Sequence, residues 1–260
     1  MRCERPACPE CLRDASVGYQ CVDCIREAQG TVRRPRTFVG AEVGTRPLVT
    51  PILIAVNVLM FAFTAVQAQS VANNQQSALF AEFVLWPTGV AGLGEWWRLL
   101  TAGFLHYGLT HLALNMIALY VLGRDLEPAF GRLRFLGLYL VSLFGGDVAV
   151  YLFGSPDSLT AGASTAVYGL MGAMLVAVLK LKLNPGTALA IIGLNVVLSF
   201  TLPGISLLGH LGGLVVGAGL AAGLIYAPRE RRDLWQGALV AATTLVLIGL
   251  VLVGTARFGL

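Results

Sequence analysis

Three histidines and one serine stand out because they lie in or beside long apolar stretches of the sequence. The chain has only three histidines, His106, His111 and His210, and Ser164 lies in a stretch rich in small residues. An imidazole can accept the proton of a serine hydroxyl and make it a nucleophile. Ionisable groups inside a membrane are costly to bury, and they are functional hypotheses by default. We therefore predict acyl transfer by Ser164 and His210, which at a membrane means hydrolysis of a peptide or lipid ester.

The expected depths of these residues agree with one site. Ser164 lies sixteen residues before Lys180, and His210 lies nineteen before Arg229, which are the first basic residues after their stretches. At about 1.5 Å of rise per helical residue, Ser164 lies roughly 24 Å and His210 roughly 28 Å from the level of these basic residues. His111 lies at a similar level, roughly 24 Å, if its helix runs on to residue 127. Three segments far apart in sequence would thus meet in one outer layer of the bilayer.

Donors for an oxyanion are also present at suitable spacings. His111 and Asn115 are four residues apart, which places them on one face of a helix. Gly162 and Ala163 precede Ser164, and such small residues let a backbone N–H approach a reacting carbonyl group. We predict that His111 and Asn115, with a backbone N–H near Ser164, supply the donors for an oxyanion.

The composition indicates what must position these residues. Of 260 residues, 56% are hydrophobic and 12% are charged, too few charges to cover a soluble globular surface. Seven apolar stretches approach the length needed to cross about 30 Å of hydrocarbon. We therefore predict an all-α, polytopic membrane protein in the cell membrane. The stretches are residues 48–68, 99–122, 133–153, 161–179, 186–202, 205–226 and 234–253.

The basic residues predict the orientation. Counted around these stretches, sixteen of the eighteen Lys and Arg residues fall on one side, and only Arg98 and Arg257 fall on the other. The positive-inside rule then places the N-terminus in the cytoplasm and the C-terminus outside. The net charge of +4 is accounted for by this asymmetry, so we expect no nucleic-acid partner. The polar residues 1–46 before the first stretch lack the pattern of a signal peptide.

The N-terminal segment has a different chemistry. Two Cys-x-x-Cys pairs, formed by Cys8, Cys11, Cys21 and Cys24, have the spacing of a four-cysteine zinc site. A segment this small has almost no core, so a structural zinc ion would supply its folding energy. A disordered tail with unpaired or disulfide-linked cysteines is the alternative, although a cytoplasmic location disfavours disulfides. Cys3 lies outside this pattern and is interpreted as a remnant of a second, incomplete site.

Several of these motifs together resemble the rhomboid family of intramembrane serine proteases. The resemblance covers about residues 47–226, which implies a six-helix core followed by a seventh transmembrane helix. The chain then divides into a cysteine-rich segment (1–30), a basic linker (31–46), the core (47–226) and a basic loop with the seventh helix (227–260). The matching motifs are Trp97-Arg98, His106-x4-His111-x3-Asn115, Gly162-x-Ser164 with Tyr168, and His210-x2-Gly213-x3-Gly217.

The resemblance implies roles for individual residues. It implies Ser164 as nucleophile and His210 as general base in a dyad without an acid, with no cofactor for catalysis. It implies that His111, Asn115 and the Ser164 backbone N–H bind the oxyanion. It implies transmembrane proteins as substrates, cleaved near the external face. Supporting residues are Gly162 in the serine motif, Tyr168 packed on the His210 ring, His106, Trp97 and Arg98 holding a loop, and Glu127, which resembles an acidic residue ending the second span.

Two residues depart from this pattern or fall outside it. Thr165 stands where the family usually has glycine, and a β-branched residue beside the nucleophile could disturb the oxyanion site. A catalytically weak or inactive rhomboid-like protein that binds membrane helices therefore stays as an alternative, and a transporter is the least favoured one. Asp147 lies in the third stretch, where an acid could complete a Ser-His-Asp triad, but a structural role is favoured.

Purely structural roles are alternatives for several of these residues. A serine in a membrane helix often bonds its own i−4 carbonyl, and glycines at small-xxx-small spacing, such as Gly213 and Gly217, favour close helix packing. Trp96 and Trp97 could alternatively anchor the protein at the membrane–water interface. The sequence does not indicate the oligomeric state.

Overall fold

A computed structural model describes residues 8–31, 35–43, 46–201 and 205–257. The chain divides into two compact units, Met1–Arg36 and Thr37–Leu260. Cys3 and parts of the linker, at residues 32–34 and 44–45, lie outside the described residues.

The first unit is a short hairpin followed by a helix. Strands β1 (Leu12–Asp14) and β2 (Tyr19–Cys21) pair antiparallel, with Leu12 opposite Cys21. Gly18 has a φ of +71° in the connecting turn, a conformation that glycine adopts without strain. A 3-10 turn, η1 (Pro9–Cys11), precedes the hairpin and α1 (Val22–Thr31) follows it. This small unit therefore adds a two-stranded hairpin to an otherwise helical chain.

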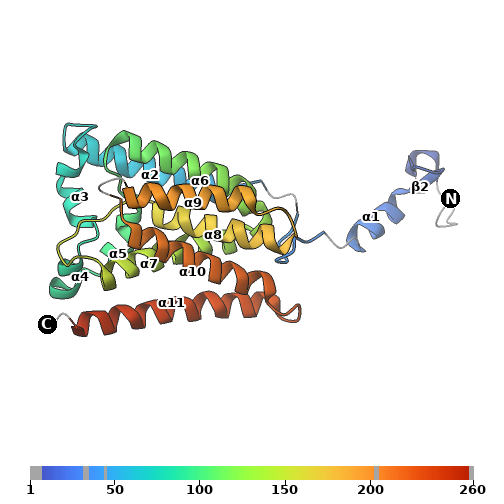
Figure 1. Ribbon diagram of the computed structural model, residues 1–260. Helices are drawn as coiled ribbons and strands as arrows, with labels where there is room; N and C mark the ends of the chain where they lie inside the picture. Colours follow the sequence, from blue (N-terminus) through green and yellow to red (C-terminus); the bar gives the residue numbers. More distant parts are fainter. Residues whose placement is uncertain (1–7, 32–34, 44–45, 202–204, 258–260) are drawn as a thin grey trace. The chain divides into compact units, whose positions relative to one another are not determined.

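The second unit is an all-helical bundle, as predicted. Its long helices run side by side, and the short helices α3 and α4 lie at one end (Figure 1). Helix α8 packs against α6, α7 and α10, and nearly all of its first half is buried. The elements are α2 (Val49–Gln67), η2 (Asn74–Gln76), α3 (Ala78–Phe83), α4 (Pro87–Leu93), α5 (Arg98–Thr101), η3 (Ala102–Phe104), α6 (Gly108–Phe130), α7 (Arg132–Phe153), α8 (Ser164–Lys180), α9 (Gly186–Thr201), α10 (Leu207–Tyr226) and α11 (Arg232–Arg257).

Four of the described helices, α2, α7, α10 and α11, are long and apolar enough to cross a membrane. A fifth span exists if α5, η3 and α6 are counted together, although they are bent by 92°. Helices α8 and α9 are apolar but shorter. The chain is therefore a multi-pass membrane protein by length and composition.

The second predicted stretch, residues 99–122, is not one continuous helix. The backbone leaves the helical conformation between Phe104 and Gly108, where Gly108 has a φ of +71°. The buried side chain of Asn74 bridges the break, donating to the His106 carbonyl oxygen at 2.8 Å and accepting from the Gly108 N–H at 2.9 Å. Because these backbone groups find a side-chain partner, the helix can break here without leaving buried polar groups unpaired.

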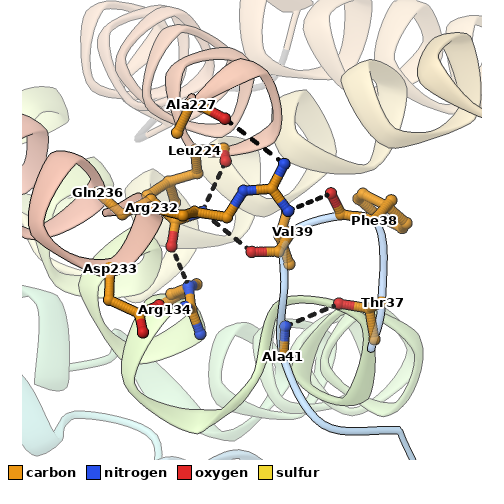
Figure 2. A network of polar contacts seen from close by, with 10 residues as sticks. All are labelled: Thr37, Phe38, Val39, Ala41, Arg134, Leu224, Ala227, Arg232, Asp233 and Gln236. Carbon is orange, nitrogen blue, oxygen red and sulfur yellow. Dashed lines mark hydrogen bonds and ion pairs between the residues drawn. The ribbon is translucent and has the colours of Figure 1, made fainter. Parts of the chain in front are cut away.

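A polar network joins α7, α10 and α11 to the segment at residues 37–41 (Figure 2). The Gln236 amide donates to the Leu224 carbonyl at 2.8 Å and to the Val39 carbonyl at 3.1 Å, while its oxygen accepts from Arg134 at 2.6 Å. The side chain is almost completely buried, so it holds α11 to the chain that leads into α2.

Candidate active site

The local backbone presents Ser164 at the start of a buried helix. Ser164 is the first residue of α8, so its N–H is one of the four that an α-helix leaves without an intrahelical partner. The positive end of the helix dipole lies at the same place. Gly162 has a φ of +138°, a conformation that side chains rarely allow, and its N–H donates to the Ala102 carbonyl at 3.0 Å. The start of α8 is therefore suited to stabilising a negative charge.

His111 lies directly against this turn. A Cβ atom built on Gly162 would lie 2.9 Å from His111 Nε2 and 3.5 Å from Ser164 Oγ, so imidazole and hydroxyl border the same small volume. The Tyr107 N–H donates to His111 Nδ1 at 3.3 Å. Because Nδ1 accepts this bond, a neutral His111 carries its proton on Nε2, and that N–H is a donor on the Ser164 side.

Two further predicted residues flank His111. Asn115 is buried, and its amide donates to the His111 carbonyl oxygen at 3.0 Å, which fixes the side chain one helical turn from the imidazole. His106 is fully buried, and its ring lies 5.1 Å from that of His111. The Ala163 N–H points to His106 Nε2 at 3.4 Å, so His106 supports the backbone just before Ser164.

His210 is held from two sides on α10. Its ring stacks on Tyr168 of α8, with centroids 4.0 Å apart and planes at 15°. Its Nδ1 hydrogen-bonds to Ser199 Oγ of α9 at 2.6 Å. Nε2 is therefore the ring nitrogen left for a reacting partner. The described side chains of Ser164 and His210 are not joined by a hydrogen bond, a common state for catalytic pairs without substrate.

Glycines bring the two helices close together. A Cβ on Gly213 would lie 2.0 Å from the Thr165 carbonyl oxygen, and one on Gly217 would lie 2.3 Å from that of Gly169. Only glycine permits such an approach. The first turn of α8, which carries Ser164, thus packs against the turn of α10 that carries His210.

Thr165 fills space that glycines leave free. A Cβ on Gly209 would lie 2.9 Å from Thr165 Cγ2, and one on Gly146 would lie 2.7 Å from Thr165 Cβ. Thr165 is buried, and its hydroxyl has no hydrogen-bond partner. The side chain of Thr165 therefore packs against Gly146 of α7 and Gly209 of α10.

The loop before α6 is held by Arg98 and Trp97. Arg98 is 4% exposed, and its guanidinium donates to the carbonyl oxygens of Ala81 at 2.7 Å and Val84 at 2.9 Å. It also pairs with Glu95 at 2.6 Å. The Trp97 indole donates to the Glu82 carbonyl at 3.2 Å, and the residue is 42% exposed. Both side chains therefore tie α3 and its flanking residues to the start of α5.

The partners of Glu127 and Ser199, and the surroundings of Asp147, could not be foreseen from the sequence. Glu127 accepts hydrogen bonds from the backbone of Leu48 and Val49 and from Thr50, at 2.6 to 2.8 Å, and so caps the start of α2. Asp147 is buried with Oδ2 unpaired, and the position beside His210 Nδ1 is occupied by Ser199. A polar residue near the end of an otherwise apolar stretch was the only available signal for Ser199.

The N-terminal cysteines lie around the hairpin. Cys11 directly precedes β1 and Cys21 ends β2, so the pairing of Leu12 with Cys21 brings both cysteine pairs to one end. The sulfur atoms of Cys8 and Cys11 lie 2.8 Å apart, and this contact lowers the pKa of Cys8 and raises that of Cys11. Among the described residues, no group of three or more His, Cys, Asp or Glu side chains is close enough to hold a metal ion.

Comparison with known proteins gives a consistent result. A model of the Rhomboid domain matches residues 93–229. The chain is 35% identical over 184 residues to the rhomboid protease GluP of Bacillus subtilis, covering 69% of this chain but 35% of GluP. It is 33% identical to YdcA of the same organism, also named for the rhomboid family, over 72% of this chain and 92% of YdcA. RHOMBOID-like protein 6, mitochondrial, of Arabidopsis thaliana is 40% identical over 56% of this chain and 48% of its own length. The chain thus spans half or less of GluP and of the Arabidopsis protein.

Proposed function

Because the chain belongs to the rhomboid family, we propose that it is an intramembrane serine endopeptidase in which Ser164 is the nucleophile and His210 the general base. The observation that carries the proposal is the close packing of α8 on α10 at Gly213, which brings the turns bearing these two residues together. Several relatives are named rhomboid proteases, which supports the same class of reaction.

The first chemical step is attack on a peptide carbonyl. Ser164 Oγ forms a bond to the carbonyl carbon while its proton passes to His210 Nε2, and the carbonyl oxygen becomes an oxyanion. The Nε2–H of His111, the Asn115 amide and the Ser164 N–H are the donors proposed for this oxyanion. Donors of this kind are worth about 3 kcal/mol each in transition-state stabilisation when they are fixed in advance.

The second half returns the enzyme to its starting state. His210 gives its proton to the leaving amine as the C–N bond breaks, leaving an acyl-enzyme on Ser164. Water, deprotonated by the same imidazole, then attacks the ester and releases Ser164. These groups and water suffice for the reaction, so the proposed mechanism uses no cofactor.

The proposed substrates are transmembrane proteins. A scissile bond must leave its helix before Ser164 can attack it, because helical backbone is closed by its own hydrogen bonds. Segments with glycine or other weak helix formers are therefore the preferred sites. The proposed cleavage point lies near the external face, at the level of Ser164.

Cleavage of a reconstituted transmembrane substrate tests the dyad. Ser164→Ala and His210→Ala should each reduce cleavage by at least about 1000-fold, because each removes a group that the reaction requires. A fluorophosphonate probe should label the wild type and not Ser164→Ala. Cleavage that persists in either variant would refute the dyad. An unlabelled, inactive wild type in lipid would instead support a rhomboid-like protein that binds membrane helices without cleaving them.

The proposed membrane arrangement has a six-span core, residues 47–226, and a seventh span in α11. In this arrangement α8 and α9 also cross the bilayer, although they are shorter than the other long helices. The N-terminus lies in the cytoplasm and the C-terminus outside, since most basic residues fall on the N-terminal side.

We further propose that Cys8, Cys11, Cys21 and Cys24 bind a structural zinc ion. Thiolates are preferred zinc ligands, and the hairpin holds both cysteine pairs at one end. Zinc coordinated by the four thiolates would stabilise the folded N-terminal unit, which has almost no hydrophobic core. Metal analysis of the purified chain should find one zinc per molecule, and Cys8→Ser with Cys11→Ser should remove it. Absence of zinc from wild type purified without chelators would refute the site.

A further inference from the structure

Ser199 is the residue through which α9 contacts the candidate active site. Within α9, all of whose residues the structure describes, Ser199 alone is buried. The neighbouring large side chains of Val197 and Phe200 are 57% and 78% exposed. Ser199 is also the one residue of α9 whose side chain hydrogen-bonds to another described helix, at Tyr168 of α8 and His210 of α10.

The hydrogen bonds of Ser199 determine which ring nitrogen of His210 carries the proton. Ser199 Oγ lies 2.7 Å from the Asn195 carbonyl oxygen, 2.7 Å from Tyr168 Oη and 2.6 Å from His210 Nδ1. A carbonyl oxygen can only accept, so the single hydroxyl proton of Ser199 is directed to Asn195. The two lone pairs of Oγ then accept from the other partners, namely Tyr168 O–H and His210 Nδ1–H.

The opposite assignment would be unfavourable. If Ser199 donated to His210 Nδ1, its oxygen would lie 2.7 Å from the Asn195 carbonyl oxygen with no proton between them. In a buried site such a contact between two acceptors costs free energy, because neither atom can turn to water. The geometry therefore favours the neutral imidazole with its proton on Nδ1.

We propose that Ser199 is a positioning residue that holds His210 in the tautomer whose Nε2 is unprotonated and free to act as a base. This inference rests on the proposed function of His210. It assigns to a serine of α9 the orienting role that an aspartate has in Ser-His-Asp triads. The same bond remains when His210 takes the proton of Ser164, because Nδ1–H is still the donor and Ser199 the acceptor.

The arrangement also links α9 to the base. The Tyr168 ring holds one face of the imidazole, and Ser199 holds its edge. A displacement of α9 would remove the acceptor from Nδ1 while leaving the ring stacked on α8. The proton could then move to Nε2, and His210 would no longer be a base toward Ser164.

The tautomer can be measured without any activity. The chain has only three histidines, so ¹⁵N-histidine labelling of the full chain in lipid gives a simple nitrogen spectrum. The His210 signals are identified by their loss in His210→Ala. At neutral pH we expect a protonated Nδ1 and an unprotonated Nε2 in the wild type. In Ser199→Ala we expect a mixture of tautomers or a protonated Nε2.

Activity measurements on matched variants form the second arm. Ser199→Ala should lower kcat about tenfold, the effect of losing one hydrogen bond to the base, with KM changed less than about twofold. Ser199→Thr keeps the hydroxyl and the bond to the i−4 carbonyl, and should restore most of kcat. Thr201→Ala is the control, because Thr201 is exposed on the same helix and its hydroxyl bonds the Val197 carbonyl. It should leave kcat unchanged.

The outcomes separate the two proposals. A wild-type His210 protonated on Nε2, or a spectrum unchanged in Ser199→Ala, would overturn the role of Ser199 whatever the activity. A fall in kcat in Thr201→Ala equal to that in Ser199→Ala would do the same. Failure of the dyad itself would appear as cleavage by Ser164→Ala or His210→Ala, which these spectra do not measure.

Discussion

At the scale of single residues, the protonation of the imidazoles gives the candidate site its chemistry. The Tyr107 N–H makes Nδ1 of His111 an acceptor, so its Nε2–H becomes a donor beside Gly162. In the proposed tautomer Ser199 accepts the Nδ1–H of His210, so Nε2 of His210 becomes an acceptor. Two identical side chains thus acquire opposite roles from one backbone group and one hydroxyl.

Thr165 provides a prediction at this scale. Its methyl group packs on Gly209, while its hydroxyl is buried without a partner. Thr165→Val keeps the shape and removes the unpaired group, so we expect cleavage to be retained and stability to be equal or higher by about 1 kcal/mol. Thr165→Ala should lower stability by about 1 kcal/mol, because it leaves a small cavity. Denaturant titration in micelles measures both, and inactivity of Thr165→Val would show that the hydroxyl serves catalysis.

Asp147 provides a second one. Because Ser199 occupies the position beside His210 Nδ1, no triad acid is needed there. Asp147→Asn should therefore retain kcat within about threefold, because the substitution removes no acid that His210 depends on. Steady-state cleavage of a reconstituted substrate measures this. Loss of turnover in a folded Asp147→Asn protein would restore the triad hypothesis.

At the scale of elements, the site depends on how closely neighbouring helices approach and on where helices begin or break. Gly213 and Gly217 let α10 touch the backbone of α8. The break between η3 and α6 turns His106 and His111 toward the start of α8, and Asn74 satisfies the backbone groups that the break exposes.

The glycines of α10 allow a matched test. A Cβ on Gly217 would lie 2.3 Å from the Gly169 carbonyl oxygen, whereas one on Gly219 would meet nothing within 4 Å. Gly217→Ala should lower the free energy of unfolding by about 3 kcal/mol and separate α8 from α10. Gly219→Ala should keep or slightly raise stability, since alanine favours helix. Equal effects of the two substitutions on unfolding in micelles would contradict this account of the packing.

The cap on α2 gives another prediction. The Glu127 carboxylate accepts from three backbone N–H groups and the Thr50 hydroxyl at a helix start, where negative charge is favourable. Glu127→Gln has one acceptor oxygen, so it should destabilise the fold by roughly 3 kcal/mol. Glu82→Gln, at an exposed carboxylate on α3, serves as the control. Comparable unfolding midpoints for the two variants would disprove the capping role.

At the scale of the whole molecule, composition indicates the membrane environment, and the distribution of charge is the basis of the proposed orientation. The described helices supply four apolar spans, or five with the bent pair, in agreement with a multi-pass membrane protein. The cysteine-rich segment belongs to one compact unit, Met1–Arg36, and the candidate site belongs to the other, Thr37–Leu260.

The proposed orientation has a direct test. Epitope tags are placed before Met1 and after Leu260, and intact cells stripped of their outer layers are treated with protease. The N-terminal tag should be protected and the C-terminal tag cleaved, because basic flanks are retained in the cytoplasm. Permeabilised cells, in which both tags are cleaved, are the control. A protected C-terminal tag in intact cells would contradict the seven-span arrangement.

The sequence by itself determined the membrane class, the approximate positions of the long helices and the residues that could do chemistry. These properties follow from local composition, periodicity and spacing, which need no knowledge of neighbours in space. The sequence thus singled out Ser164, His111 and His210 as candidates. It did not foresee the break in the second stretch, because Asn74, which satisfies the open backbone, lies far from it in sequence.

Only the tertiary structure decided the partners of buried polar groups. Ser199 lies eleven residues from His210 on another helix, and Glu127 lies 77 to 79 residues from the backbone it caps. From the sequence alone, Thr165 is expected to disturb the backbone beside Ser164, and only its contacts with Gly146 and Gly209 show where its side chain packs. Such contacts depend on the register and spacing of packed helices, and these are set by the whole core at once rather than by any one segment.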